Sequence, residues 1–212
     1  MAFAIHEASV DDAEDLARIY VACHIDDDVW KILTANVKHQ DHVEWVANNS
    51  RAQYHLPERK VYKVIDTATG KIVAYATLTS PYPSSEEERA TSASTAGKSL
   101  PPGINEGLMK EFFGMLSSTK AYGYDPDKHF HRKGTMVLPE YQRKGLGTML
   151  NAHCNDLADK AKAATYVAAR PNSLPMLQKS GFKILADEKI DMTKYGGSRE
   201  DGKAWALIRE PQ

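Results

Sequence analysis

The spacing of apolar residues along the first part of the chain predicts strands alternating with helices. Residues 3–8 predict a short opening strand, and Ser9 with Asp12 forms a capping-box pattern before apolar positions at helical spacing. A second helical region is expected at about 30–52. Residues 60–66 and 71–79 read as two strands joined by the turn at 67–70, which predicts a hairpin.

The second half of the chain continues as strand–helix–strand units. Helices are predicted over 105–120, from Gly145 onward and over 173–179, and strands over 130–138, 165–169, 182–185 and 203–209. The buried stripe expected on the helix from Gly145 consists of Leu146, Met149, Leu150, His153 and Leu157. A front hairpin followed by such units predicts one α/β (α+β) sheet with helices on its faces.

Residues 81–103 interrupt this pattern. The segment is rich in Ser, Pro, Thr and Glu and has few apolar residues. We therefore expect a polar, flexible insertion, or a substrate lid, within a single domain that spans residues 1–212.

Composition narrows the possible functions. The 212 residues are 42% hydrophobic, which is enough for a sizeable core, and a net charge of -1 gives no general attraction to nucleic acid or anionic membranes. Cys23 and Cys154 have neither metal-binding nor redox spacing and are expected to be free thiols. With no recognisable signal peptide or spanning segment, we expect a cytoplasmic protein without a metal, membrane or nucleic-acid partner.

The segment 137–150 carries the most specific chemical signal. An apolar strand end leads into a basic, glycine-bearing turn, and a helical apolar pattern then begins. Such an arrangement predicts an anion site at a helix N-terminus, where free backbone N–H groups and the helix dipole converge. Gly145 and Gly147 let the backbone approach a ligand, and Arg143 and Lys144 add positive charge.

Residues 142–147, with the sequence Gln-Arg-Lys-Gly-Leu-Gly, match the Q/R-x-x-G-x-G/A signature of the GNAT N-acetyltransferase superfamily. The strand before them, the helix after them and the Gly181-Phe182 pair agree with that resemblance. The insertion and the chain ending resemble small-molecule-type GNAT proteins that are frequent in fungi. The resemblance implies the GNAT fold, a central mixed, mostly antiparallel sheet that is splayed at its middle strands and flanked by helices.

The resemblance also implies an acetyl-coenzyme A-dependent N-acetyltransferase that acts on a small-molecule amine, in a family where homodimers are common. The cofactor's pyrophosphate would bind the loop, and its pantetheine arm would pair with backbone groups at 136–138. The cofactor-binding residues predicted in this way are Met136, Val137, Leu138, Gln142, Arg143, Lys144, Gly145, Leu146, Gly147, Thr148 and Asn172.

The family's catalytic pattern is incomplete in this chain. Leu177 stands where many members carry the Tyr that protonates the leaving thiolate, and Arg170 stands where an Asn is common. His131 occupies the position of a frequent Glu base, which makes it our candidate base; the alternative is a solvated or hydrogen-bonded strand residue. Alternation along the strand predicts that His131 shares one face with residues 133, 135 and 137.

Several other residues admit two interpretations. The Asp26–Asp28 cluster predicts either a site for a cationic amine or a solvated helix cap, and we favour the cap. Trp30 and Tyr82 are candidates for the wall of an acceptor pocket, although apolar packing explains them equally well. Tyr124 and Tyr195 are candidate replacement acids.

Two further functions stay open at this point. One is a GNAT-fold enzyme with non-acetylating chemistry, such as isomerisation, cyclisation or dehydration of a metabolite. The other is a non-enzymatic module that binds coenzyme A. The missing Tyr, the base-like position of His131 and the long lid-like insertion motivate the first of these alternatives.

Overall fold

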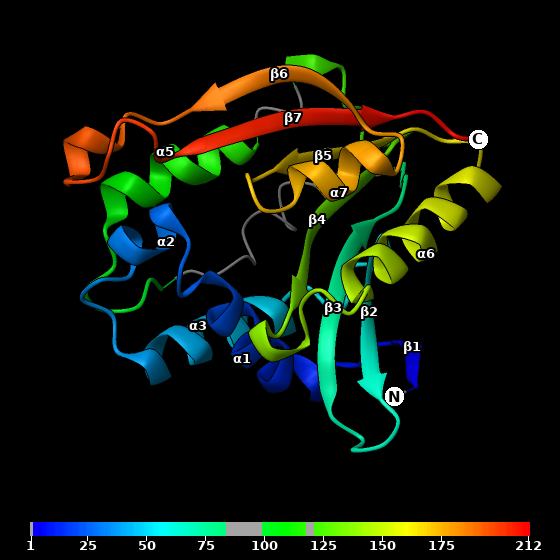
Figure 1. The fold of residues 1–212 in the computed structure, drawn as a ribbon, viewed down its shortest axis with the longest axis horizontal. Helices are drawn as coiled ribbons and strands as arrows, with labels where there is room; N and C mark the ends of the chain where they lie inside the picture. Colours follow the sequence, from blue (N-terminus) through cyan, green and yellow to red (C-terminus); the bar gives the residue numbers. More distant parts are fainter. Residues whose placement is uncertain (1, 84–98, 118–120) are drawn as a thin grey trace.

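The computed structural model describes residues 2–83, 99–117 and 121–212, so most of the predicted insertion lies outside the described residues. Seven strands form one sheet in the order β1-β2-β3-β4-β5-β7-β6 (Figure 1). Their bounds are β1 Phe3–Glu7, β2 Arg59–Asp66, β3 Ile72–Thr79, β4 Phe130–Val137, β5 Thr165–Ala169, β6 Lys183–Lys189 and β7 Lys203–Arg209. Only β4 and β5 are parallel among these described strands, which confirms the mixed, mostly antiparallel sheet.

The longer helices are α1 Ala13–His24, α2 Asp28–Leu33, α3 His39–Arg51, α5 Glu106–Leu116, α6 Leu146–Lys160 and α7 Leu174–Lys179. The single helical region expected at about 30–52 is wrong, because α2 and α3 are separate helices. Thr34 ends α2: its hydroxyl and its backbone N–H both donate to the carbonyl of Trp30. Such side-chain bonds to the backbone compete with helix continuation.

The sheet opens between β4 and β5. These two strands pair at only three positions, Phe130 with Thr165, His131 with Tyr166 and Arg132 with Val167. Beyond Arg132 the strands diverge, as Figure 1 shows, although β4 continues to Val137. The predicted splay is therefore confirmed, and none of the described strands lies beside the far part of β4 on the β5 side.

Helices cover both faces of the sheet. Two neighbouring β2 residues reveal the arrangement: Val61 lines a cavity together with Tyr20 of α1, whereas the ring of Tyr62 lies 4.4 Å from that of His153 on α6. Because successive strand residues point to opposite faces, α1 and α6 lie on opposite sides of the sheet. No described helix is long and apolar enough to span a bilayer.

The buried face of α6 differs from the predicted stripe. Leu146 and Leu150 are buried as expected, but Met149, His153 and Leu157 are only partly buried. The other buried residues of α6 are Asn151, Cys154, Asn155 and Ala158. The stripe is rotated because the neighbouring β4 strand presents a polar residue, Arg132, whose guanidinium donates to the amide oxygen of Asn151.

A bulge in β4 changes which side chains share a face. Thr77 of β3 pairs with Gly134, and Leu78 pairs with Arg132, which leaves Lys133 as an extra residue. The guanidinium of Arg132 donates to the hydroxyl of Thr135, so these two side chains lie on the same face, toward α6. The predicted shared face of residues 131, 133, 135 and 137 is therefore wrong, because the extra residue reverses the alternation after the bulge.

Candidate functional site

The connection from β4 to α6 forms an open cradle of backbone N–H groups. Arg143 has a φ of 61° and Gly145 a φ of 83°, so the turn contains two left-handed residues, a conformation found in anion-binding nests. Gly145 precedes α6, and no side chain caps the helix N-terminus. The first turns of α1, α2, α3 and α5 contain acidic residues, whereas that of α6 contains none. This N-terminus therefore fits an external anion.

Two cations border the cradle. Arg143 and Lys144 are exposed, and neither forms an ion pair within the described residues. The ammonium of Lys144 lies 4.5 Å from the centre of the Tyr141 ring, which holds that charge beside the loop. Thr148 is also exposed on the first turn of α6. These residues fit a pyrophosphate, which needs positive charge and several N–H donors.

Glycine is favoured at positions 145 and 147 of the motif for different structural reasons. A Cβ on Gly145 would meet no atom within 4 Å, so the left-handed backbone alone favours glycine there. A Cβ on Gly147 would lie 3.2 Å from the sulfur of Met176 on α7. Gly147 thus permits the close packing of α6 against α7.

The end of β4 is fastened from several sides. The side-chain amide of Gln142 donates to the carbonyl of Val137 at 3.1 Å, and the thiol of Cys23 donates to the same carbonyl at 3.0 Å. The N–H of Leu138 donates to the carbonyl of Val73, and its carbonyl accepts from Tyr141. Several backbone groups at 137–138 are therefore already bonded, and those left for an extended ligand lie nearer the bulge.

A cavity of about 390 Å³, which we call the inner cavity, lies on the α1 face of the sheet. Lys133, Gly134 and Met136 of β4 form one wall, and residues of β2, β3, α1, α3 and α5 line the rest. The wall in β4 coincides with the bulge and with the part of the strand that is splayed from β5. The inner cavity thus lies over β2, β3 and the part of β4 that extends beyond its pairing with β5.

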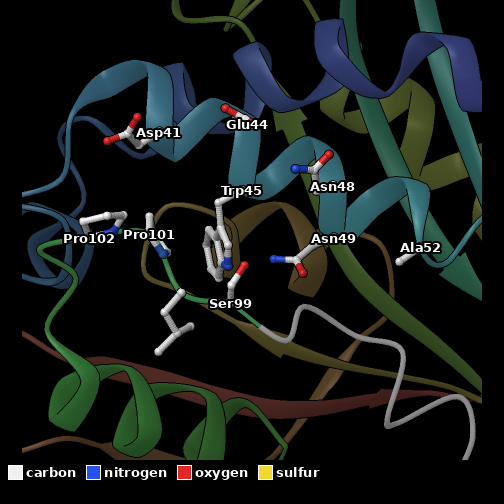
Figure 2. A pocket seen from close by; sticks show the side chains of 10 residues that line it. Asp41, Glu44, Trp45, Asn48, Asn49, Ala52, Ser99, Pro101 and Pro102 are labelled. Atoms are coloured by element: carbon white, nitrogen blue, oxygen red, sulfur yellow. The ribbon is translucent and has the colours of Figure 1, made fainter.

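A second cavity of about 520 Å³, the outer cavity, lies between α3 and the segment 99–102. Figure 2 shows the indole of Trp45 pointing from α3 toward Ser99 and Pro101. Trp45 and Asn49 line both cavities, so the two spaces adjoin at these residues. Asp41 and Glu44 give the outer cavity acidic groups.

His131, the candidate base, is 4% exposed and does not belong to the lining of either cavity. It lies in the short section of β4 that pairs with β5, and its ring is 4.9 Å from that of Tyr124. Burial raises the pKa of Tyr124 to about 12, so this candidate acid stays protonated near neutral pH. His131 therefore lies where the splay begins, two residues before the cavity wall at Lys133.

The aspartate cluster serves as a helix cap and as the partner of an internal cation. The Asp27 carboxylate accepts from the N–H groups of Val29 and Trp30, which confirms the predicted cap. It also lies 3.3 Å from the guanidinium of Arg170, which bonds Asp28 as well. The cap is not solvated as expected, because the Asp27 side chain is only 12% exposed. The structure gives these two carboxylates an internal cation in place of an external amine.

Other predicted residues lie away from the cavities. Trp30 is buried in an aromatic cluster, stacked 5.6 Å from His42, and Tyr82 bonds the carbonyl of Pro126. Neither lines a described cavity. Tyr195 packs in the cluster around α5, away from β4. Asn172 is exposed in the loop before α7.

The position of the usual acid is filled by packing. Leu177 is buried in a small core with Val167, Phe182 and Leu207. Its neighbours are therefore apolar, and Leu177 is part of this core.

Sequence reasoning missed most of the inner cavity, including its polar residues Tyr20, Arg59 and Tyr75. Burial raises the pKa of both tyrosines well above the ordinary value, so both phenols stay protonated. The sequence placed Tyr20 and Tyr75 correctly within a helix and a strand, but no local pattern indicates that they face a common space. That relationship depends on how α1 and α3 pack on the hairpin.

Comparison with known proteins agrees with the fold. Residues 105–192 match the family model of the acetyltransferase (GNAT) domain. No curated protein sequence matches the chain significantly.

Among solved structures, the C-terminal condensation domain of Ebony in complex with beta-alanyl-dopamine is similar, with a TM-score of 0.74 and 12% identity over 99% of each chain. Arylalkylamine N-acetyltransferase 2 from Aedes aegypti has a TM-score of 0.66 and 16% identity over 100% of each chain. The ribosomal-protein-S18-alanine N-acetyltransferase from Escherichia coli has a TM-score of 0.57 and 13% identity, over 99% of this chain and 94% of that one. At these identities the similarity concerns the fold alone.

Proposed function

We propose that this chain, which has the fold of the GNAT acetyltransferases, transfers the acetyl group of acetyl-coenzyme A to the amine of a small-molecule metabolite. The observation that carries the proposal is the uncapped N-terminus of α6 beside the splay of β4 and β5. An anion cradle and an unpaired strand edge lie next to a cavity there, which suits a long phosphorylated cofactor and a second substrate.

The proposed binding of coenzyme A uses the cradle for the pyrophosphate. The N–H groups at the start of α6, together with Arg143 and Lys144, would hold the negative charge. Gly145 supplies the left-handed backbone that turns these groups toward one point. The bound thioester would supply an activated acetyl group at the inner cavity.

The proposed acceptor site is the inner cavity. Its volume of about 390 Å³ suits a small molecule. His131 is the proposed base, and a bound water would relay the amine's proton because the imidazole is buried and does not line the cavity. Tyr20 and Tyr75 line the cavity as protonated phenols whose raised pKa makes them weak acids. Either hydroxyl would therefore stabilise the departing thiolate by donating a hydrogen bond, not by giving up its proton.

The composition and the free cysteines support a cytoplasmic location as part of the same proposal. Cys154 is buried and Cys23 is partly buried, and neither forms a disulfide.

A direct assay tests the proposed reaction. The protein is incubated with acetyl-coenzyme A and panels of small amines, and free thiol and acetylated product are measured. We expect thiol release that depends on one class of amine. Tight binding of coenzyme A without product for any amine would contradict the transfer and favour a binding module.

A charge-reversal variant tests the cradle separately. Arg143→Glu combined with Lys144→Glu should lower the affinity for coenzyme A at least tenfold in calorimetry, and the loss should shrink at high salt. The control is Lys160→Glu at the other end of α6, where the lysine pairs only with Asp156 of its own helix. Equal affinity in the double variant and the control would show that the pyrophosphate binds elsewhere.

A second candidate function follows from two observations. Leu177 supplies no hydroxyl at the usual acid position, and the Ebony condensation domain, crystallised with an amide, has a similar fold. The alternative is that the chain forms or transforms a metabolite without transferring acetyl. A panel of other acyl-coenzyme A thioesters, and an assay without any coenzyme A, would separate this function from acetyl transfer.

A further inference from the structure

Among the described residues that line the inner cavity, the charged side chains are both basic. Arg59 and Lys133 belong to its lining, and none of the described lining residues is Asp, Glu or His. The adjoining outer cavity has the opposite character, with Asp41 and Glu44. Arg59 gives the described part of this lining a positive charge, which suits a ligand that carries an anionic group.

Arg59 is fixed by hydrogen bonds that use only part of its guanidinium N–H donors. It begins β2, and its N–H donates to the carbonyl of Leu56, which fixes the backbone. Its guanidinium donates to the side-chain oxygen of Gln53, a neutral acceptor at the end of α3. A guanidinium has five N–H donors, so most of them are not used by this bond. Among the described residues Arg59 has no ion pair.

The surroundings of Arg59 disfavour a charged guanidinium that has no anionic partner. Burial lowers the pKa of its guanidinium, while Tyr75, Tyr54 and Glu58 act in the opposite direction. Glu58 is near enough to influence the charge, although it forms no ion pair with Arg59. A partly desolvated guanidinium gains more from an anionic ligand than an exposed one does.

Other buried arginines have their partners within the protein. Arg170 pairs with Asp27, and Arg209 pairs with Asp159 at 2.7 Å. Arg132 is satisfied in a polar network toward α6, away from both cavities. Arg59 is distinguished by being both partly buried and part of a cavity lining.

We infer that the acceptor amine also carries a carboxylate, and that Arg59 binds this carboxylate in the inner cavity. The inference rests on the proposed acetyl transfer for the fate of the amine, but the anion site itself does not. A guanidinium binds a carboxylate through two parallel hydrogen bonds, which fixes orientation as well as charge. Held in this way, the substrate's amine would point away from Arg59, toward the β4 wall at Gly134 and Met136.

The other lining residues indicate what kind of side chain the acceptor carries. Val46, Val61, Met109 and Phe113 form apolar walls. Asn49 and Ser50 of α3, and Gln53 in the turn after it, supply neutral polar groups to the same lining as Arg59. The acceptor class that suits this lining is an amino carboxylate with an apolar or aromatic side chain.

Matched acceptors test the inference. Phenylalanine is compared with phenethylamine, which lacks the carboxylate, with phenylalaninamide, which is neutral there, and with the corresponding aminophosphonate. We expect kcat/KM for the carboxylate to exceed that for the decarboxylated amine and the amide at least tenfold. Equal or better use of phenethylamine would overturn the inference while leaving acetyl transfer intact. A preference for the phosphonate over the carboxylate would overturn the assignment to a carboxylate.

Variants of Arg59 give a second test of the carboxylate site. Arg59→Gln should abolish the preference for the carboxylate, and Arg59→Lys should keep part of it, because lysine retains the charge without the paired donors. The control is Arg51→Gln on α3, an exposed arginine that bonds Asn48 and lines neither cavity. Circular dichroism and thermal unfolding establish that each variant is folded. A folded Arg59→Gln protein with an unchanged preference would overturn the inference.

Calorimetry with phenylalanine and N-acetylphenylalanine, without cofactor, separates the two proposals. Binding that depends on Arg59, in a protein that acetylates no amine, would uphold the anion site and contradict acetyl transfer. Acetylation of amines together with carboxylate binding that is unaffected by Arg59→Gln would uphold the transfer and contradict the anion site.

Discussion

The guanidinium of Arg170 lies 3.3 Å from the carboxylate of Asp27, which is 143 residues earlier in the chain. Asp27 caps α2, and Arg170 follows β5, so the pair joins the N-terminal helices to the loop before α7. Arg170 also donates to the backbone carbonyl of Lys203 and lies 5.6 Å from the Phe112 ring centre. The residue at the family's Asn position thus has a structural role here.

Removing one member of this pair should destabilise the fold. Arg170→Leu leaves Asp27 buried without its cation, and we expect a loss of about 2–4 kcal/mol in the free energy of unfolding. Urea denaturation measures it, and a double-mutant cycle with Asp27→Asn isolates the pairwise part. Asp26→Ala is the control, since the Asp26 side chain is 92% exposed. If the Arg170→Leu protein is stable and binds amines more tightly, Asp27 belongs to an amine site and the structural role is contradicted.

Replacing Gly147 by a larger residue should lower the stability of the free protein, in addition to any effect on coenzyme A binding. A larger residue there would press on the sulfur of Met176, so Gly147→Val should cost about 1–3 kcal/mol even without coenzyme A. Thermal unfolding of the free protein measures the cost, and Met176→Ala in the same chain should recover part of it. Full stability of Gly147→Val, with coenzyme A binding lost, would mean that the glycine faces the ligand instead.

Tyr75 lies beside the far part of β4, because it pairs with Met136 across the strands. If its phenol donates a hydrogen bond to the departing thiolate, Tyr75→Phe should lower kcat about 10- to 100-fold and leave coenzyme A affinity unchanged. Tyr62→Phe, on the opposite face beside His153, is the matched control. An unchanged kcat in Tyr75→Phe would mean that the thiolate leaves without this tyrosine.

His42 should make the fold sensitive to mild acid. Burial lowers its pKa to about 4, below the ordinary value of about 6.5 in an unfolded chain. As pH falls below about 6.5, the unfolded chain takes up a proton that the folded chain refuses. Stability is therefore lost between about pH 6.5 and 4, on the order of 1–3 kcal/mol. His24, whose pKa burial also lowers, contributes in the same direction.

Urea denaturation at pH 7, 5.5 and 4.5 measures this effect. His42→Leu should flatten the dependence on pH, and His55→Gln should leave it unchanged because His55 is exposed. Identical slopes in the wild type and His42→Leu would show that other groups control the acid sensitivity.

Local patterns predicted most elements because strands, turns and caps depend on nearby residues. The Ser9–Asp12 capping box is present, with the N–H of Ser9 donating to Asp12 at 2.7 Å. The hairpin of β2 and β3 and the order of later elements are also as predicted. The division of α2 from α3 was missed, since it follows from a single hydroxyl at Thr34 that bonds the preceding turn.

The site was predictable only in its local part. The loop at 142–148 is a contiguous segment whose backbone conformation follows from its own glycines and its position between a strand and a helix. Its partners were not predictable: the anchoring of Val137 by Cys23 joins residues 114 positions apart. The face of Thr135 depends on one extra residue in a strand, and alternation from the sequence gives no sign of it.

The sequence by itself determined the strand–loop–helix cradle and the likeness to the GNAT superfamily, because both reside in short contiguous motifs. Tertiary structure alone decided that Asp27 holds Arg170, that Leu177 belongs to a core, and that Arg59 lines a cavity beside the splayed part of β4. These relationships arise from packing between distant elements, where burial and charge pairing select partners that local spacing does not encode.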